Sequence, residues 1–416
     1  MSARLGARLA AGARASILAL AALAATVGFA AAADPSPSPG SETSTGPSAG
    51  PGHVPVLAYY YIWYNESSWT HTKTDWPALG PYDSTNPAVI HQQVAWAKES
   101  GVDALIVSWK STPALNKALG ELIAECQSQG LKLVLLYEGL DVNRNPISVA
   151  TVRSDLVSFM NQYASDPVFD VYGKPAIVWS GTWRFSDSDV ASVRSLIGAP
   201  DNVLLLGSEK SAQAYSPRAS LFDGNAYYWS SADPLATPGY QNRLNELSNA
   251  VHAAGGLWLA PAPAGFDARL NGGTSTVDRR DGQTLRTAWA DALVSKPDGL
   301  AVISWNEFTE NSYVEPSQKF GLQYLKVLAS LTGAPGPVDG SLPTAAPATA
   351  TDSPTPPALA SPAGAGSTGR GVPRPAPLND YTSAIGASLV GLILLAAGLP
   401  AYVIWKRRMK RLFGGT

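Results

Sequence analysis

The sequence predicts an α/β protein with a single (β/α)8 barrel, of the TIM-barrel type, over residues 53–333. Short, nearly continuous apolar runs alternate there with amphipathic helical segments, a pattern typical of parallel strands that helices cover. The domain has about 280 residues and eight such repeats, which is the size of one closed barrel. A doubly wound open sheet is the main alternative, but the sequence offers no Gly-rich phosphate loop for it.

Each element follows from this alternation, taken in chain order. Strands are expected at 54–64, 102–110, 132–138, 175–180, 202–209, 225–230, 257–261 and 299–305. Helices are expected at 87–100, 114–129, 149–164, 187–196, 240–254, 282–294 and 320–330, with only a short irregular link between the fifth and sixth strands. Gly101, Gly130, Gly255 and Gly256 lie where helices should stop, because glycine readily takes the left-handed conformation that ends a helix.

The segments outside the barrel predict a location outside the cell. Residues 1–33 combine three arginines with an apolar run and small residues, as a secretory signal peptide does. Residues 34–52 and 334–380 are rich in Pro, Ser, Ala and Thr and predict a disordered linker and a disordered stalk. Residues 384–405 are apolar, uncharged and long enough for a transmembrane helix. The basic tail, 406–416, would then be cytoplasmic, so we expect a single-pass type I protein of the cell membrane.

Composition argues against several other classes of function. The single cysteine, Cys126, cannot form a disulfide framework, and four histidines without a Cys/His grouping give no zinc signature. A net charge of −2 gives no reason to expect nucleic acid as a partner. We therefore expect no metal. We also expect a monomer that the C-terminal helix holds in the membrane.

A pair of carboxylates follows the eighth predicted strand. Residues 304–310 read SWNEFTE, so Glu307 and Glu310 lie in a loop where both side chains can point over the barrel axis. Barrel enzymes build their sites at this end of the strands. Glycoside cleavage needs two such acids, one to protonate the leaving oxygen and one to assist attack at the anomeric carbon. The alternative is that both are solvent-facing or salt-bridged loop acids.

Aromatic and acidic residues gather at the other strand ends as well, where they suit the faces and hydroxyl groups of sugars. We expect the following side chains to bind substrate: Tyr61, Trp63, Tyr64, Trp109, Glu138, Asp141, Tyr228, Trp229 and Asn306. Some have a structural alternative. Asp141 could be a turn residue, and Trp109 or Trp229 could pack under a helix.

Four motifs in this order resemble glycoside hydrolase family 99, the endo-α-mannosidase and endo-α-mannanase group. The family pattern YYxWY reads YYIWY at 60–64, and PxLGxYxSxxPxVIxxQ reads PALGPYDSTNPAVIHQQ at 77–93. A strand ending in SW is matched at 108–109, and WNEWHEGxxIEP reads WNEFTENSYVEP at 305–316. The similarity extends over the whole central domain.

The resemblance implies a retaining endo-α-mannosidase on a (β/α)8 barrel that needs no metal or organic cofactor. In that family one glutamate takes the proton of the sugar 2-hydroxyl, which gives a 1,2-anhydro intermediate, and the other serves as acid and then as base at the glycosidic oxygen. By position in the motif, Glu307 would be the base and Glu310 the acid/base.

The chain departs from the family pattern at two positions of the last motif. Thr309 stands where the family has histidine, and Asn311 where it has glycine. Two alternatives therefore stay open. One is an endo-α-1,3-glucanase of the related family 71, and the other is a catalytically inactive barrel that binds surface glycans through its aromatic residues.

Overall fold

The computed structural model describes residues 53–141, 143–198, 202–338, 340 and 342. The predicted signal peptide, N-terminal linker, transmembrane segment and basic tail lie outside the described residues, as does most of the predicted stalk. Within the described part of the chain, no helix is both long and apolar enough to span a bilayer.

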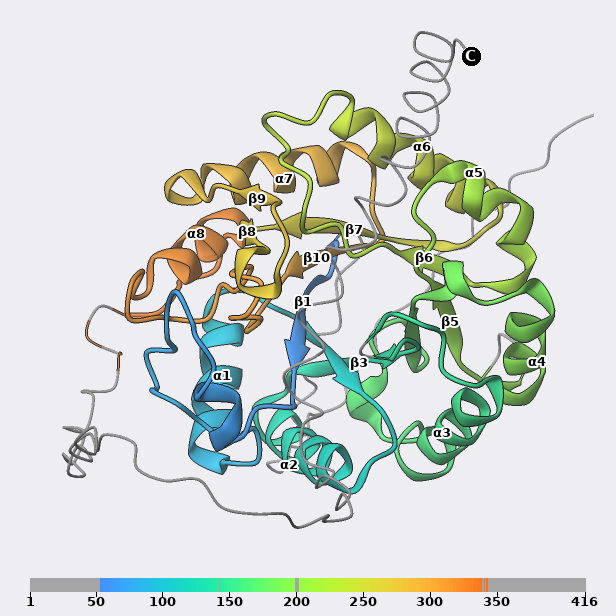
Figure 1. Ribbon diagram of the computed structural model, residues 1–416, viewed down its shortest axis with the longest axis horizontal. Coiled ribbons are helices and arrows are strands. Elements are labelled where there is room, and N and C mark those ends of the chain that lie inside the picture. The colour runs from blue at the N-terminus through green and yellow to red at the C-terminus, as the bar shows by residue number, and fades with distance from the viewer. Residues whose placement is uncertain (1–52, 142, 199–201, 339, 341, 343–416) are drawn as a thin grey trace, which may run out of the picture. The chain divides into compact units, whose positions relative to one another are not determined.

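Eight parallel strands close into a barrel, as predicted, in the order β1-β10-β7-β6-β5-β4-β3-β2 (Figure 1). They are β1 (Val56–Tyr61), β2 (Ala104–Trp109), β3 (Lys132–Glu138), β4 (Ala176–Ser180), β5 (Leu204–Gly207), β6 (Gly224–Ala226), β7 (Leu257–Pro263) and β10 (Gly299–Ile303). The first and last strands close the ring, with Val56 opposite Leu300. Between β7 and β10 the chain adds a small hairpin that the sequence did not predict, β8 (Phe266–Asp267) and β9 (Thr276–Val277).

Helices surround the barrel and cover its outer face (Figure 1). They are α1 (Pro87–Glu99), α2 (Pro113–Gln129), α3 (Val149–Gln162), α4 (Asp187–Ile197), α5 (Ala212–Tyr215), α6 (Tyr240–Ala253), α7 (Gln283–Val294) and α8 (Gln323–Thr332). Several begin at residues whose side chains accept a hydrogen bond from a first-turn amide, namely Asn86, Thr112, Ser148 and Ser186. Only the four-residue α5 was not predicted.

The core has two layers, and strand alternation decides which residue enters which layer. In β1, Leu57, Tyr59 and Tyr61 belong to the cluster inside the barrel, whereas Ala58 and Tyr60 pack with the helices. Successive side chains of a strand point to opposite faces, so every second residue faces the barrel axis. Tyr61 therefore reaches the mouth of the barrel from the C-terminal end of β1.

Candidate active site

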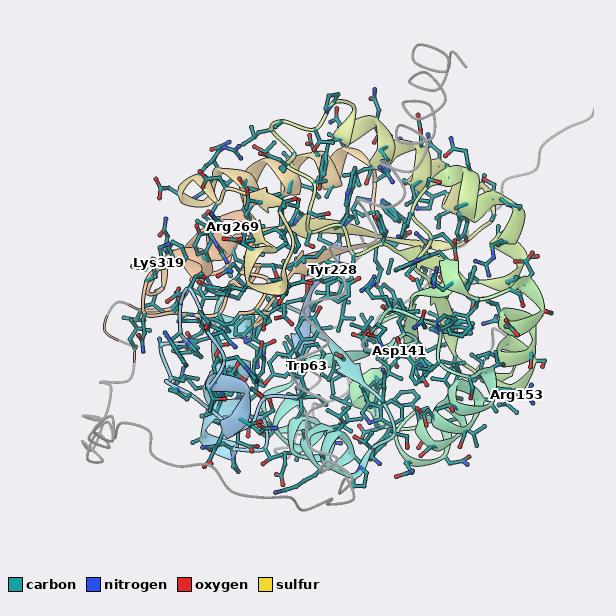
Figure 2. All side chains as sticks on the ribbon, in the orientation of Figure 1. Trp63, Asp141, Arg153, Tyr228, Arg269 and Lys319 are labelled. Carbon is teal, nitrogen blue, oxygen red and sulfur yellow. The ribbon has the colours of Figure 1, made fainter. Side chains whose placement is uncertain are left out.

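One cavity of about 380 Å³ opens among the C-terminal ends of the strands. Its walls include six residues that the sequence predicted for the site: Tyr61, Trp63, Glu138, Tyr228, Glu307 and Glu310. Figure 2 shows Trp63 and Tyr228 near the middle of the ring of strands, whereas Arg153 and Lys319 lie at its periphery. The cavity is thus the place where the predicted carboxylate pair meets aromatic side chains.

The loop after β10 carries the carboxylate pair and is fixed by buried hydrogen bonds. The Asn306 side chain accepts a bond from the Tyr61 backbone N–H (2.8 Å) and donates one to the Tyr61 carbonyl (2.9 Å). The Tyr64 hydroxyl donates to the Asn306 carbonyl at 2.7 Å, and the Glu307 backbone N–H donates to the Ser304 hydroxyl. These contacts tie the loop to β1 and hold both glutamates at the cavity.

Glu307 is 5% exposed, and burial raises the pKa of its carboxyl to about 7. Hydrogen bonding from Thr309, whose backbone N–H lies 2.9 Å from Oε1, and the positive charge of Lys73 both act against this rise. Because these two groups favour the charged form, Glu307 is the member of the pair that ionises more easily.

Glu310 is 2% exposed, and the pKa of its carboxyl lies well above the usual range. Burial is the main cause, and the negative charge of Glu307 adds to it, while Arg144 opposes the rise. The two carboxyl groups titrate as a pair, so one proton stays on the pair near neutral pH and mainly on Glu310. Such a split gives one ionised base and one protonated acid.

Neither glutamate is committed to a structural ion pair in the described residues, where the arginine partners are other acids. Glu310 accepts a long hydrogen bond, 3.4 Å, from the Tyr228 hydroxyl. The alternative interpretation, that the pair consists of salt-bridged loop acids, has no support in this geometry. No group of three or more His, Cys, Asp or Glu within the described ranges is arranged to hold a metal ion.

Two predicted tryptophans lie outside the cavity, which corrects the prediction for them. Trp109 is fully buried on the helix side of β2, next to Phe159, and its indole N–H donates to Asn116 at 2.9 Å. Trp229 stacks on Tyr240 of α6, with ring centroids 4.8 Å apart. Both therefore have the structural role that was the alternative, since they stabilise the packing of helices on the barrel.

Three further predicted residues support the site and do not line it. Tyr64 is buried against Trp69, with ring centroids 4.7 Å apart, and Asn306 is fully buried behind the carboxylate loop. Asp141 accepts hydrogen bonds from the backbone N–H groups of Asn143 and Asn145, so it is a turn residue.

The sequence prediction missed basic residues of the cavity wall: Arg144, Arg184 and Lys210. Each follows the end of a strand, as the predicted acids and aromatic residues do. Their position after a strand was the signal that could have found them, because any side chain at the C-terminal end of a barrel strand can reach the cavity.

Replacing Lys73 with methionine is expected to move the acidic limb of the pH profile. The Lys73 charge favours the ionised form of Glu307, so its loss should raise the Glu307 pKa further. We expect kcat/KM to fall several-fold below pH 7 and to change less above it. The measurement is a pH profile of kcat/KM, with Lys73→Arg as the charge-preserving control. An unchanged acidic limb in Lys73→Met would show that the Lys73 charge does not lower the pKa of Glu307.

A third buried acid, Glu315, lies behind the same loop. It accepts hydrogen bonds from Gln93 Nε2 (2.7 Å) and from the Tyr82 hydroxyl (3.0 Å), and Tyr82 in turn accepts one from Asn306. Burial raises its pKa to about 8. Glu315 therefore links the carboxylate loop to α1 through side chains alone.

Glu315→Gln is expected to remove part of the pH dependence of stability. A carboxyl whose pKa is raised on folding stabilises the folded state below its unfolded pKa, and this contribution is lost as the pH rises through about 8. Between pH 5 and pH 9 the free energy of unfolding of the wild type should therefore fall by about a few kcal/mol more than that of the variant. Denaturant unfolding at both pH values measures this difference. Exposed Glu246, on α6, provides the control variant Glu246→Gln; parallel curves for Glu315→Gln and wild type would disprove the assignment.

Comparison with known protein families identifies the family of this barrel. The profile of glycosyl hydrolase family 99 matches residues 71–328. The chain belongs to glycosyl hydrolase family 99. The resemblance noted in the sequence is thereby confirmed, and the match includes the carboxylate loop of this family 99 barrel.

Individual proteins that are similar to this chain are consistent with its membership of the family. The chain is 25% identical over 265 residues to a glycoprotein endo-alpha-1,2-mannosidase of Xenopus laevis, and it spans 58% of the length of that relative. A solved GH99 endo-alpha-mannosidase from Bacteroides thetaiotaomicron, in complex with bis-tris-propane, superimposes with a TM-score of 0.60 at 19% identity. That match covers 68% of this chain and 97% of the other. A glycoside hydrolase-like protein gives a TM-score of 0.53 at 14% identity, covering 67% and 94%. These structures share the fold of the family 99 barrel.

Proposed function

We propose that this protein is a retaining endo-α-mannosidase that cleaves α-mannosidic linkages within a glycan. The observation that carries the proposal is the pair Glu307 and Glu310, both buried at one cavity, with the proton held mainly by Glu310. Membership of family 99 and the endo-mannosidase relatives support mannose glycans as the substrate class.

In the first step of the proposed reaction, ionised Glu307 takes the proton of the mannose 2-hydroxyl. The 2-oxygen then bonds to the anomeric carbon as the glycosidic bond breaks, and Glu310 gives its proton to the leaving oxygen. This needs one ionised and one neutral carboxyl at the start, which is the state that the two pKa shifts favour near pH 7.

In the second step the roles reverse. Glu310, now ionised, takes a proton from water as the water oxygen attacks the anomeric carbon. The three-membered ring opens, and Glu307 returns its proton to the 2-oxygen. Two inversions at the anomeric carbon give net retention, and both carboxyl groups end in their starting states.

Aromatic side chains next to the pair suit the apolar face of a sugar ring. Tyr61 and Trp63 lie 4.4 Å apart between ring centroids, and both line the cavity. The Tyr228 hydroxyl, in the same cavity, donates to Glu310 at 3.4 Å. We infer that Tyr61 and Trp63 stack on the mannose residue whose bond is cleaved.

We propose in addition that the barrel works outside the cell, held by residues 384–405. The support is the order of apolar and basic segments in the sequence, from the predicted signal peptide to the basic tail. Protease treatment of intact cells tests this. Loss of the barrel with retention of a small membrane-bound fragment is the expected result, and a protected barrel would contradict it.

The activity is tested with the full chain on panels of α-mannan and α-glucan. We expect oligosaccharides from α-mannan, formed first as the α-anomer by NMR, and none from the variants Glu307→Gln and Glu310→Gln. Release from α-1,3-glucan alone would instead support the glucanase alternative. Binding without release from any polymer would support the glycan-binding alternative.

A further inference from the structure

Three cations line one wall of the cavity outside the ion pairs of the described residues. Arg144 follows β3, Arg184 follows β4 and Lys210 follows β5, and none of them forms an ion pair in the described part of the chain. Neighbouring Arg218 is different, because it contacts Glu209 at 2.6 Å and Asp187 at 2.8 Å. The acid closest in sequence to Lys210 is therefore already neutralised by another residue.

These cations lie across the barrel from the carboxylate pair. Strands β3, β4 and β5 are consecutive in the closed ring of eight, and β4 is four places from β10 in either direction. Glu307 and Glu310 follow β10, so this carboxylate pair and the cations occupy opposite walls of one cavity, whereas Glu138 ends β3 on the side of the cations. A glycan bound at the acids thus extends toward the cations with a neighbouring sugar or with a substituent.

The cations are close enough to one another for repulsion to matter. Lys210 Nζ lies 4.1 Å from the centroid of the Trp183 ring, and the Arg144 guanidinium lies 5.9 Å from the same ring. Partial burial is the main cause of the lowered Lys210 pKa, and the charge of Arg144 lowers it further. A partly desolvated cluster of like charges costs free energy unless an anion joins it.

The balance of charge differs among the three. Arg144 interacts with the charge of Glu138, at the end of β3 on its own wall, and with that of Glu310, so it serves partly as a counter-charge to these two acids. Arg184 is exposed, and Lys210 is half-buried on Trp183. Arg184 and Lys210 therefore provide the positive charge that the protein itself leaves without a partner.

We propose that the substrate glycan carries an anionic group, a phosphate or a carboxylate, which binds to Arg184, Lys210 and Arg144 on the wall opposite Glu307 and Glu310. The inference rests on the proposed function and specifies its substrate class. Arginine and lysine suit such oxyanions because they donate several charge-assisted hydrogen bonds to them.

The test compares matched substrates on the full chain. One α-mannan is used in three forms: unmodified, oxidised at C6 to carry carboxylates, and phosphorylated at C6. We expect kcat/KM to be about tenfold higher for at least one anionic form, and the two forms distinguish carboxylate from phosphate. Lys210→Met and Arg184→Gln should each reduce the ratio of anionic to neutral kcat/KM several-fold. Arg286→Gln, an exposed cation on α7, should leave the ratio unchanged.

Binding measurements test the anion site independently of the proposed activity. Calorimetry with methyl α-mannoside, its 6-phosphate and the corresponding uronate should show tighter binding of an anionic probe, reduced in Lys210→Met and by added salt. If the kcat/KM for neutral mannan equals that for both anionic forms, the proposed anion site is wrong, and the proposed mannosidase activity is retained. If no polymer is cleaved but an anionic probe binds through Lys210, the activity fails and the anion site stands.

Discussion

Glu307→Gln and Glu310→Gln are each expected to lower kcat/KM on α-mannan by about 10³-fold. A general acid or base typically accelerates a reaction about 10²- to 10⁴-fold, and the expected loss lies within this range. Glutamine is a neutral side chain of nearly the same shape, so the cavity should keep its form, and the melting temperature should not fall. The measurement is the initial rate of oligosaccharide release, with Glu246→Gln on the outer helix α6 as the control.

A substrate with a better leaving group distinguishes the two roles. Fluoride departs without a proton, so an α-mannobiosyl fluoride needs the base at the 2-hydroxyl but not the acid. We expect initial fluoride release to be largely restored in Glu310→Gln and to remain low in Glu307→Gln. Restoration in Glu307→Gln and not in Glu310→Gln would show that the two assignments are exchanged. Full activity of either variant on mannan would exclude that residue from catalysis.

Asn306→Ala is expected to damage both stability and turnover. The substitution removes the side-chain partners of the Tyr61 backbone N–H and carbonyl, which are buried, and each unpaired group costs about 1–3 kcal/mol. The loop that carries Glu307 then keeps its backbone bond from Trp305 to Tyr59 of β1 but loses both side-chain bonds to Tyr61. A displacement of about 1 Å at reacting groups can cost 10²-fold in rate, so we expect kcat to fall by about that factor.

The balance of effects identifies what Asn306 does. As a positioning residue it should lower kcat and the free energy of unfolding together, with little change in KM. If it contacted substrate, as the sequence prediction had it, KM would rise while stability stayed constant. Denaturant unfolding and steady-state kinetics provide both measurements. Asn249→Ala, an exposed asparagine on α6, should change stability by no more than about 0.5 kcal/mol.

The fold could be predicted almost completely from the sequence, because each strand and helix carries its own local signal. The predicted and observed bounds of β3 agree fully, and those of α1 differ by one residue. The hairpin of β8 and β9 could not be predicted this way. Its strands are two residues long, and tertiary contacts, not a periodic pattern, form them.

The site could be predicted in part, and the errors have distinct causes. Alternation along β2 would have assigned Trp109 to the helix side, because its neighbour Ser108 pairs with inward-facing Tyr61. No such rule exists for Asn306 or Tyr64, because the contacts Asn306–Tyr61 and Tyr64–Asn306 join residues 245 and 242 positions apart in the sequence. The position of Glu307 and Glu310 at the cavity could be predicted because both follow a barrel strand, whose C-terminal end faces the mouth of the barrel.

The attachment of the carboxylate loop to β1 joins the two ends of the domain, and this has a consequence for the timing of activity. Asn306 and Tyr61 are 245 positions apart, so their contact forms only after nearly the whole barrel has been synthesised. A ribosome-bound or truncated chain lacks both the acids and the strand contact that orients them. Activity therefore requires a chain that extends at least through Glu310, because only then are both acids and their contact with the first strand available.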